Sequence, residues 1–232
     1  MRKRALALAL LLAGCGKPAP EEPRTANGFP QAARPVATVV SGSWSNEPAR
    51  DRKGEANAVM LAAGVKPGMT VADIGAGEGY HTIRLAAKVG PKGRVLAEDI
   101  VPLFHDRLAD RVYRDGLDNV SVKLGKPSDP QLPAGSFDRI FMVHMYHEID
   151  EPYEFLWNLR PALAPNGMAV VVDTDRPTAA HGMPQTLLDC EFAQVGYKLV
   201  ERKPMPEAGG YFAMYKAAGP RPDPRAMHAC KP

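Results

Sequence analysis

The residues most suited to bind a ligand form the run Asp-Ile-Gly-Ala-Gly-Glu-Gly at positions 73–79. A short apolar stretch precedes this run, and helical spacing follows it from Tyr80. Glycines between a strand and a helix let the backbone approach a ligand closely, and the free N–H groups of the helix N-terminus then point at that ligand. The run departs from the dinucleotide-binding fingerprint, because Tyr80 stands where a third small residue is needed for close helix–strand packing. A site for NAD is therefore disfavoured.

Two acidic residues, Glu98 and Asp99, end the next strand-like stretch, about 20 residues after the glycine run. A carboxylate at this point of an α/β sheet can accept hydrogen bonds from both hydroxyls of a ribose. The alternation of Val95, Ala97 and Asp99 favours Asp99 as the acid that faces the ligand. The alternative role for either acid is a solvated strand end or a helix cap.

A third polar group, His144-Met145-Tyr146-His147-Glu148, follows another apolar stretch. Ligands of α/β sheets bind at the carboxyl ends of the strands. We expect His147 to accept a proton from a substrate, with Tyr146 and Glu148 assisting it. The alternative is that His147 packs beneath the ligand or caps the next helix. The spacing is not that of the His-Glu-x-x-His zinc motif or its inverse, and no cysteine lies nearby, so no metal is expected.

The elements that must position these groups alternate between strand and helix. Strands are expected at 70–74, 93–100, 120–124, 137–144, 168–173, 197–203 and 210–216, and helices at 46–63, 80–89, 101–114, 152–163 and 184–195. This alternation predicts a parallel sheet covered by helices on both faces. The last two strands are too close in sequence for a crossover connection and are expected to form an antiparallel hairpin. The fold class is therefore α/β, a doubly wound, mostly parallel seven-stranded sheet.

Four stretches resemble, in family order, the class I S-adenosylmethionine-dependent methyltransferases. They are residues 71–80, 93–100, 135–140 and 163–173, and the resemblance covers about residues 46–217. The family's Rossmann-like sheet with an antiparallel hairpin agrees with the pattern above. The resemblance implies that S-adenosylmethionine is the cofactor, that Asp73, Gly75 and Gly77 line its methionine end, and that Asp99 binds its ribose.

The resemblance also places the segment after the third strand against adenine. Family members often carry an acid there, whereas this chain has Lys126, which cannot accept a hydrogen bond. Ser128 or Asp129 is the alternative acceptor. The residues expected to bind the cofactor are Asp73, Gly75, Ala76, Gly77, Gly79, Glu98, Asp99, Asp129 and His144.

The N-terminus has the pattern of an export signal. A basic start at residues 1–4 precedes an Ala/Leu run at 5–13 that is too short to span a bilayer. Leu12-Ala13-Gly14-Cys15 is similar to the lipobox of bacterial lipoproteins. That resemblance implies removal of residues 1–14, lipid attachment at Cys15 and, from Gly16, an outer-membrane location facing the periplasm. The alternatives are a buried cysteine after an accidental apolar stretch and an ordinary cleaved signal.

Composition limits the partners of the remaining chain. Hydrophobic residues make up 45% and charged residues 24%, which are ordinary globular values. Without the three basic residues of the leader, 26 Lys and Arg balance 26 Asp and Glu. A neutral protein has no electrostatic footprint for nucleic acid, so the expected partners are a small-molecule substrate and the membrane that holds the lipid.

Proline-rich segments flank the folded part. We expect residues 15–45 to be a lipidated tether, residues 46–217 the methyltransferase-like domain, and residues 218–232 a loose tail. Cys190 lies on a predicted helix and Cys230 in the tail, and a disulfide between them is allowed in an oxidising compartment but stays open.

Two hypotheses for function remain. The first is a lipid-anchored methyltransferase. The second is a non-catalytic module that binds an adenosyl compound on the same fold, since S-adenosylmethionine is made in the cytoplasm and fold alone does not establish catalysis. The glycine run and Asp99 favour the enzyme. The Asn/Asp-Pro-Pro-aromatic motif of many DNA and protein amine methyltransferases is absent, and Arg50-Asp51-Arg52 can either bind an anionic substrate or form a solvated face.

Overall fold

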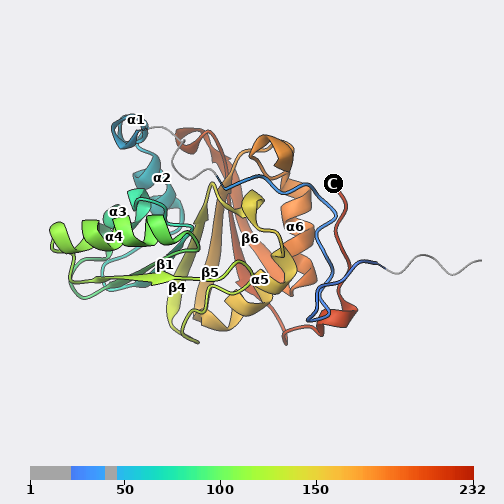
Figure 1. The fold of residues 1–232 in the computed structure, drawn as a ribbon. Coiled ribbons are helices and arrows are strands. Elements are labelled where there is room, and N and C mark those ends of the chain that lie inside the picture. Colours follow the sequence, from blue (N-terminus) through green and yellow to red (C-terminus); the bar gives the residue numbers. More distant parts are fainter. Residues whose placement is uncertain (1–21, 40–45) are drawn as a thin grey trace, which may run out of the picture.

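A computed structural model of the chain describes residues 22–39 and 46–232. Over these residues seven strands form one sheet (Figure 1). The strands are β1 (Thr70–Ile74), β2 (Arg94–Asp99), β3 (Val120–Leu124), β4 (Phe137–Val143), β5 (Leu163–Asp173), β6 (Tyr197–Met205) and β7 (Gly210–Ala217). The α-helices are α1 (Glu47–Lys53), α2 (Glu55–Ala62), α3 (Tyr80–Val89), α4 (Pro102–Arg114), α5 (Pro152–Leu159) and α6 (Gln185–Gln194).

The strand order is β3-β2-β1-β4-β5-β7-β6. The strands β3, β2, β1, β4 and β5 run parallel to one another, whereas β7 pairs antiparallel with both β5 and β6. The predicted fold class, including its closing antiparallel hairpin, is confirmed. The chain leaves β1 in one direction through β2 and β3 and then returns to β4 on the other side, so the sheet has a topological switch point between β1 and β4.

The sheet is buried on both faces. In β5, Ala169 and Val171 join the apolar cluster beneath α5 and α6, while Val170 and Val172 join the cluster beneath α2 and α3. A strand that is covered on both sides has apolar residues at consecutive positions of its sequence. This explains why the stretch around Val170 was recognisable in the sequence.

Two helices differ from their expected bounds. The helix expected over 46–63 is split into α1 and α2 by Gly54, which adopts a left-handed φ of 72°. Asn46 begins α1 as expected, because its side chain accepts a hydrogen bond from the backbone N–H of Ala49. The helix expected over 152–163 ends at Leu159, since Pro161 has no N–H to continue it.

The segment expected to be an extended tether differs from that expectation over residues 22–39. Phe29 is buried, and its ring lies 5.5 Å from that of Trp157 on α5. The fully buried guanidinium of Arg34 lies 2.8 Å from the carboxylate of Glu191 on α6. Prolines in this segment prevent regular strand pairing but do not prevent it from docking. Residues 22–39 therefore belong to the folded unit.

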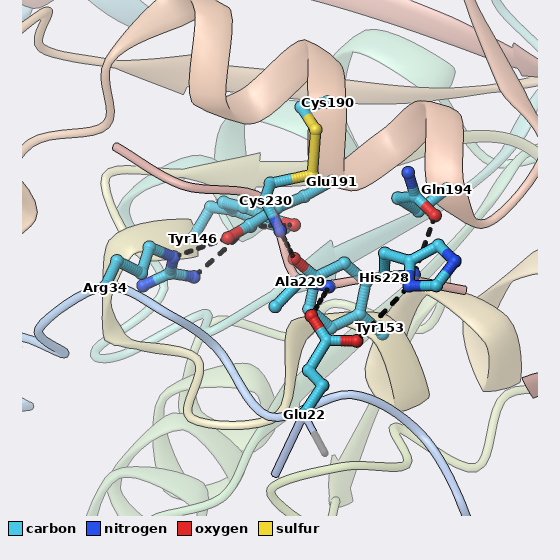
Figure 2. The surroundings of a disulfide bond; sticks show 10 residues. All are labelled: Glu22, Arg34, Tyr146, Tyr153, Cys190, Glu191, Gln194, His228, Ala229 and Cys230. Carbon is cyan, nitrogen blue, oxygen red and sulfur yellow. Dashed lines mark hydrogen bonds and ion pairs between the residues drawn. A yellow bond between two sulfur atoms is a disulfide. The ribbon is translucent and has the colours of Figure 1, made fainter. Parts of the chain in front are cut away.

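The segment expected to be a loose tail also packs on the domain. Cys230 is buried and forms a disulfide with Cys190 of α6, and its backbone N–H donates to the hydroxyl of Tyr153 at 2.6 Å (Figure 2). The N–H of Ala229 donates to Glu22 at 2.6 Å, which joins the two ends of the described chain. We call residues 22–39 together with 218–232 the terminal clasp. Figure 1 shows its two segments, blue and red, side by side past α6.

The expected leader, Cys15 and its lipid lie outside the described residues. Within residues 22–39 and 46–232, no helix has both the length and the apolar character needed to cross a membrane.

Candidate active site

A cavity of about 530 Å³ opens at the carboxyl ends of β1, β2 and β4. It lies at the topological switch point, where α/β sheets of this kind bind their ligands. Its volume is in the range of small-molecule and cofactor sites. The sequence-predicted residues that line it are Asp73, Gly75, Ala76, Gly77, Glu98, Asp99, His144 and Glu148.

The glycine loop forms one wall of the cavity. Gly75 has a left-handed φ of 64°, and a Cβ there would lie 3.0 Å from the side chain of Met145. Gly79 does not line the cavity. It precedes α3 with a φ of 87°, and a Cβ there would lie 2.4 Å from Leu108 of α4. Gly79 therefore provides the close helix packing for which Tyr80 is too large.

Asp99 holds the glycine loop in place. Its carboxylate accepts a hydrogen bond from the N–H of Gly77 at 2.8 Å and another from the N–H of Val101 at 2.9 Å. Asp73, at the end of β1, accepts a hydrogen bond from the hydroxyl of Thr82 at 2.6 Å, and burial raises the pKa of its carboxyl. Both acids are therefore positioned by the loop and helix that follow β1.

Glu98 is the more unusual of the two neighbouring acids. It is 2% exposed, and its Oε1 has no hydrogen-bond partner among the described residues. Burial and the adjacent Asp99 carboxylate raise the pKa of Glu98 to about 8. The carboxylate packs against Gly125, where a Cβ would lie 1.5 Å from Oε1. Both Glu98 and Asp99 line the cavity, so the choice of Asp99 as the ribose ligand stays a prediction.

A charged wall of Arg50, Glu55, His81 and His144 stands beside the loop. Arg50 Nε lies 2.9 Å from Glu55, and His81 and His144 lie 3.3 and 3.5 Å from the same carboxylate. Burial alone would raise the pKa of Glu55, but hydrogen bonds from His144, His81 and Arg50 outweigh it and hold this pKa well below its usual range. Arg50, His81 and His144 line the cavity and give it a polar side.

The expected proton acceptor is not at the cavity surface. The short 3-10 helix η1 (Tyr146–Glu148) turns Tyr146 and His147 into the interior, whereas Glu148 lines the cavity. His147 is 1% exposed, and its Nδ1 lies 2.9 and 3.1 Å from the two carboxylate oxygens of Asp173. The hydroxyl of Tyr146 donates to Glu191 at 2.9 Å. The assigned roles of His147 and Tyr146 in proton transfer stay predictions.

His144, which begins the polar group, has a left-handed φ of 57°. This conformation is uncommon for a residue with a side chain, and such positions concentrate at functional sites. His144 reaches the cavity, as expected for a cofactor-binding residue. Asp129 does not, since its side chain accepts from the N–H of Gln131, and Pro127 is the residue of that segment at the cavity.

His81 and Glu55 were not predicted from the sequence, and the role of Arg50 stayed open. His81 follows the glycine loop directly, on the first turn of α3, and that position was the available signal. Glu55 meets Arg50 only because Gly54 turns the chain between α1 and α2, which spacing along one continuous helix does not reveal. Arg50 also stacks on Tyr80, with its guanidinium carbon 3.7 Å from the ring centroid.

Comparisons with known proteins agree with this geometry. Residues 71–167 match the family model described as methyltransferase domain. Nocamycin O-methyltransferase from Saccharothrix syringae is 43% identical over 74 residues, which are 32% of this chain and 26% of that protein. The first curated relatives are matched over between about a quarter and a half of their own length.

Solved structures share the fold. A SAM-dependent methyltransferase from Aquifex aeolicus superposes with a TM-score of 0.64 at 23% identity, covering 74% of this chain and 97% of that one. Phosphoethanolamine N-methyltransferase 1 from Haemonchus contortus, in complex with phosphoethanolamine and S-adenosylhomocysteine, gives a TM-score of 0.60 at 18% identity over 79% of this chain and 48% of that one. These likenesses show the shared fold, and the cofactor that the sequence resemblance implies for it is S-adenosylmethionine.

The residues at the cavity fit that cofactor. Ribose hydroxyls need acceptors, and Glu98 and Asp99 supply carboxylate oxygens, one of them a buried oxygen without a partner among the described residues. The backbone of the glycine loop lines the same cavity, and the left-handed conformations of Gly75 and Gly77 let a ligand approach it closely.

Proposed function

We propose that this chain transfers a methyl group from S-adenosylmethionine to a small molecule, in the cell envelope. The observation that carries the proposal is the cavity at the switch point, bounded by the glycine loop and by the carboxylates of Glu98 and Asp99. These groups supply the cofactor's hydrogen-bonding needs. The charged wall leaves a second polar side on which a substrate can be bound.

When bound, S-adenosylmethionine supplies an activated methyl group, and the protein's main task is to orient the acceptor atom. A base is needed only if that atom arrives protonated. Among the expected proton acceptors, Glu148 reaches the cavity. His147 lies behind it and positions the turn through Asp173. We therefore place Glu148 nearest to the acceptor atom, with His147 as a positioning residue.

The size of the cavity supports a small substrate. Val39 and the α1 residues Glu47 and Arg50 line it and limit its extent. The guanidinium of Arg50 is paired with Glu55. A balanced charge over the exported chain gives no long-range attraction for a nucleic acid.

The proposed location outside the cytoplasm has two supports. The lipobox-like sequence ends at Cys15, and the disulfide between Cys190 and Cys230 is of the kind that persists in oxidising compartments. Retention of label from radiolabelled palmitate by the wild-type chain, and its loss in Cys15→Ser, is the result expected. Equal labelling of both proteins, or of neither, would refute lipid attachment at this cysteine.

Cofactor binding is tested by calorimetry with S-adenosylmethionine, S-adenosylhomocysteine, NAD and ATP. The protein used should keep residues 22–39, because Arg34 is part of the folded unit. We expect micromolar binding of the two adenosyl-sulfur compounds only, and its loss in Gly77→Val, where the loop has a left-handed φ of 55°. Arg52→Ala, an exposed change on α1, is the matched control and should bind normally. If neither adenosyl-sulfur compound binds to the wild type, the proposal is refuted.

A further inference from the structure

Three side chains that could bind a metal ion meet next to the cavity. They are His147, Glu148 and His181, whose nearest nitrogen and oxygen atoms all lie within 4.8 Å of one another. His147 and Glu148 belong to η1, and His181 belongs to the loop between β5 and α6, some 30 residues later. No metal was expected from the spacing of residues 144–148, and His181 lies outside that stretch of sequence.

His147 provides the first independent observation. Its side chain is almost fully buried, and its Nε2 has no hydrogen-bond partner among the described residues. A buried polar atom in this state calls for an explanation, because such atoms are nearly always paired. The other ring nitrogen, Nδ1, lies 2.9 Å from Asp173. A histidine that binds a metal through one nitrogen commonly donates its other N–H to a carboxylate in this way.

The loop that carries His181 provides the second observation. His181 has a left-handed φ of 54°, which is strained for a residue with a side chain. Its carbonyl oxygen accepts two hydrogen bonds from the Arg176 guanidinium, at 2.8 and 3.0 Å, and its N–H donates to Thr178. The imidazole of His181 is thereby brought edge-to-face against His147, with ring centroids 5.6 Å apart.

From these observations we propose that His147, Glu148 and His181 bind a divalent transition-metal ion, with Zn²⁺ as the expected ion. Two imidazoles and one carboxylate are an established donor set for Zn²⁺ and leave a fourth position open. Two ligands of one tetrahedral zinc ion are about 3.3 Å apart, so small side-chain rotations complete the site. Since Glu148 also lines the cavity, an ion on its carboxylate lies at the cavity wall, where its open position can take a substrate oxygen or a water.

The test measures metal binding alone and does not depend on methyl transfer. The full chain, without a polyhistidine tag, is stripped with a chelator and titrated with Zn²⁺, and then with Co²⁺, whose visible absorption reports tetrahedral nitrogen and oxygen coordination. We expect one ion per chain. Glu148→Gln and His181→Asn should each weaken binding at least tenfold, and Asp173→Asn should weaken it 10- to 100-fold through its contact with His147. Asn is chosen at position 181 because it tolerates a left-handed backbone.

His105→Ala is the matched control, because His105 lies 2.9 Å from the carboxylate of Asp106 on α4 but outside the trio. It should bind zinc as the wild type does, and circular dichroism on all variants checks that they fold. A wild-type chain that binds no zinc would overturn the inference. Equal zinc affinity in the wild type, Glu148→Gln and His181→Asn would overturn it too. A chain that binds S-adenosylmethionine but no zinc would refute this inference and leave the proposed function standing.

Discussion

Replacing Arg34 by methionine tests whether the N-terminal segment is part of the folded unit. The Arg34 side chain is fully buried, and its Nε lies 2.8 Å from the equally buried carboxylate of Glu191. It also donates to the backbone carbonyls of His147 and Ile149 at 3.4 and 3.3 Å. Without Arg34, the Glu191 carboxylate keeps only the hydroxyl of Tyr146, at 2.9 Å, among its described partners.

The expected loss of stability follows from that uncompensated charge. Removing one partner of a buried ion pair costs about 3–5 kcal/mol, because the remaining charge stays out of water. The double variant Arg34→Met/Glu191→Gln removes both charges and keeps an oxygen that can accept from Tyr146. We expect it to be more stable than Arg34→Met alone by about 2 kcal/mol or more, since a neutral pair avoids most of the desolvation cost.

Urea denaturation at pH 7 under non-reducing conditions measures these free energies of unfolding. Arg52→Met, at an exposed position of α1, is the control and should change stability by no more than about 0.5 kcal/mol. A loss of less than about 1 kcal/mol in the free energy of unfolding of Arg34→Met would refute the reasoning, because a tether that contacts the domain only weakly gives that result. If the losses of stability in Arg34→Met and in Glu191→Gln alone add up to the loss in the double variant, the coupling between Arg34 and Glu191 is refuted.

Three further predictions concern the site and the disulfide. Asp99→Asn should weaken S-adenosylmethionine binding by roughly 10- to 150-fold in calorimetry, because a hydrogen bond to a charged group contributes about 1.5–3 kcal/mol; unchanged affinity would remove Asp99 from the cofactor site. Burial raises the pKa of Glu98 from 4.5 to about 8, so between these two pH values the folded chain keeps a proton that the unfolded chain releases. The free energy of unfolding should therefore fall by about 1.4 kcal/mol per pH unit as the pH rises through this range. Glu98→Gln should lack this component, and parallel pH profiles of the two proteins in urea denaturation would contradict it. Cys190→Ser should lower the free energy of unfolding by about 2–4 kcal/mol, because the disulfide to Cys230 closes a loop with a sequence separation of 40; a reductant should destabilise the wild type similarly and leave the variant unaffected, and an unaffected wild type would argue against the bond.

The sheet was predictable from the sequence because its signals are local. The bounds of β3 and α3 agree with the expected ranges at both ends, since each is an apolar pattern between turn residues. The short connection between β6 and β7 alone predicted the antiparallel hairpin. The break at Gly54 was less predictable, because glycine is also tolerated inside helices at a modest cost.

The terminal clasp was not predictable by the same means. Proline content correctly excluded regular secondary structure, but docking depends on partners far away in sequence. Arg34 is buried only because Glu191, 157 residues later, faces it, and no local pattern carries that information. Similarly, Cys230 was placed in a loose tail because of the prolines that precede it, and its bond to Cys190 stayed open because no local pattern establishes a pairing.

The candidate site likewise contains residues that the sequence predicts and residues that it does not. Asp73, Gly77 and Asp99 were recognisable because each ends a strand or follows one directly, and the parallel sheet then brings them to one edge. His147 was assigned to the cavity because it follows β4, but the 3-10 turn that rotates it inward depends on burial against Asp173. His181 carried no signal, since its contact with His147 exists only in three dimensions.

The terminal clasp also has a consequence for the order in which the protein can mature. A chain made or exported from its N-terminus presents residues 22–39 first, yet Arg34 needs α6 and Glu22 needs Ala229, which is 207 residues further along. The earliest part of the domain is therefore among the last that can dock. Until residue 230 is released, Glu22 and the thiol of Cys190 are without their final partners, which favours late completion and gives chaperones or oxidants a defined interval in which to act.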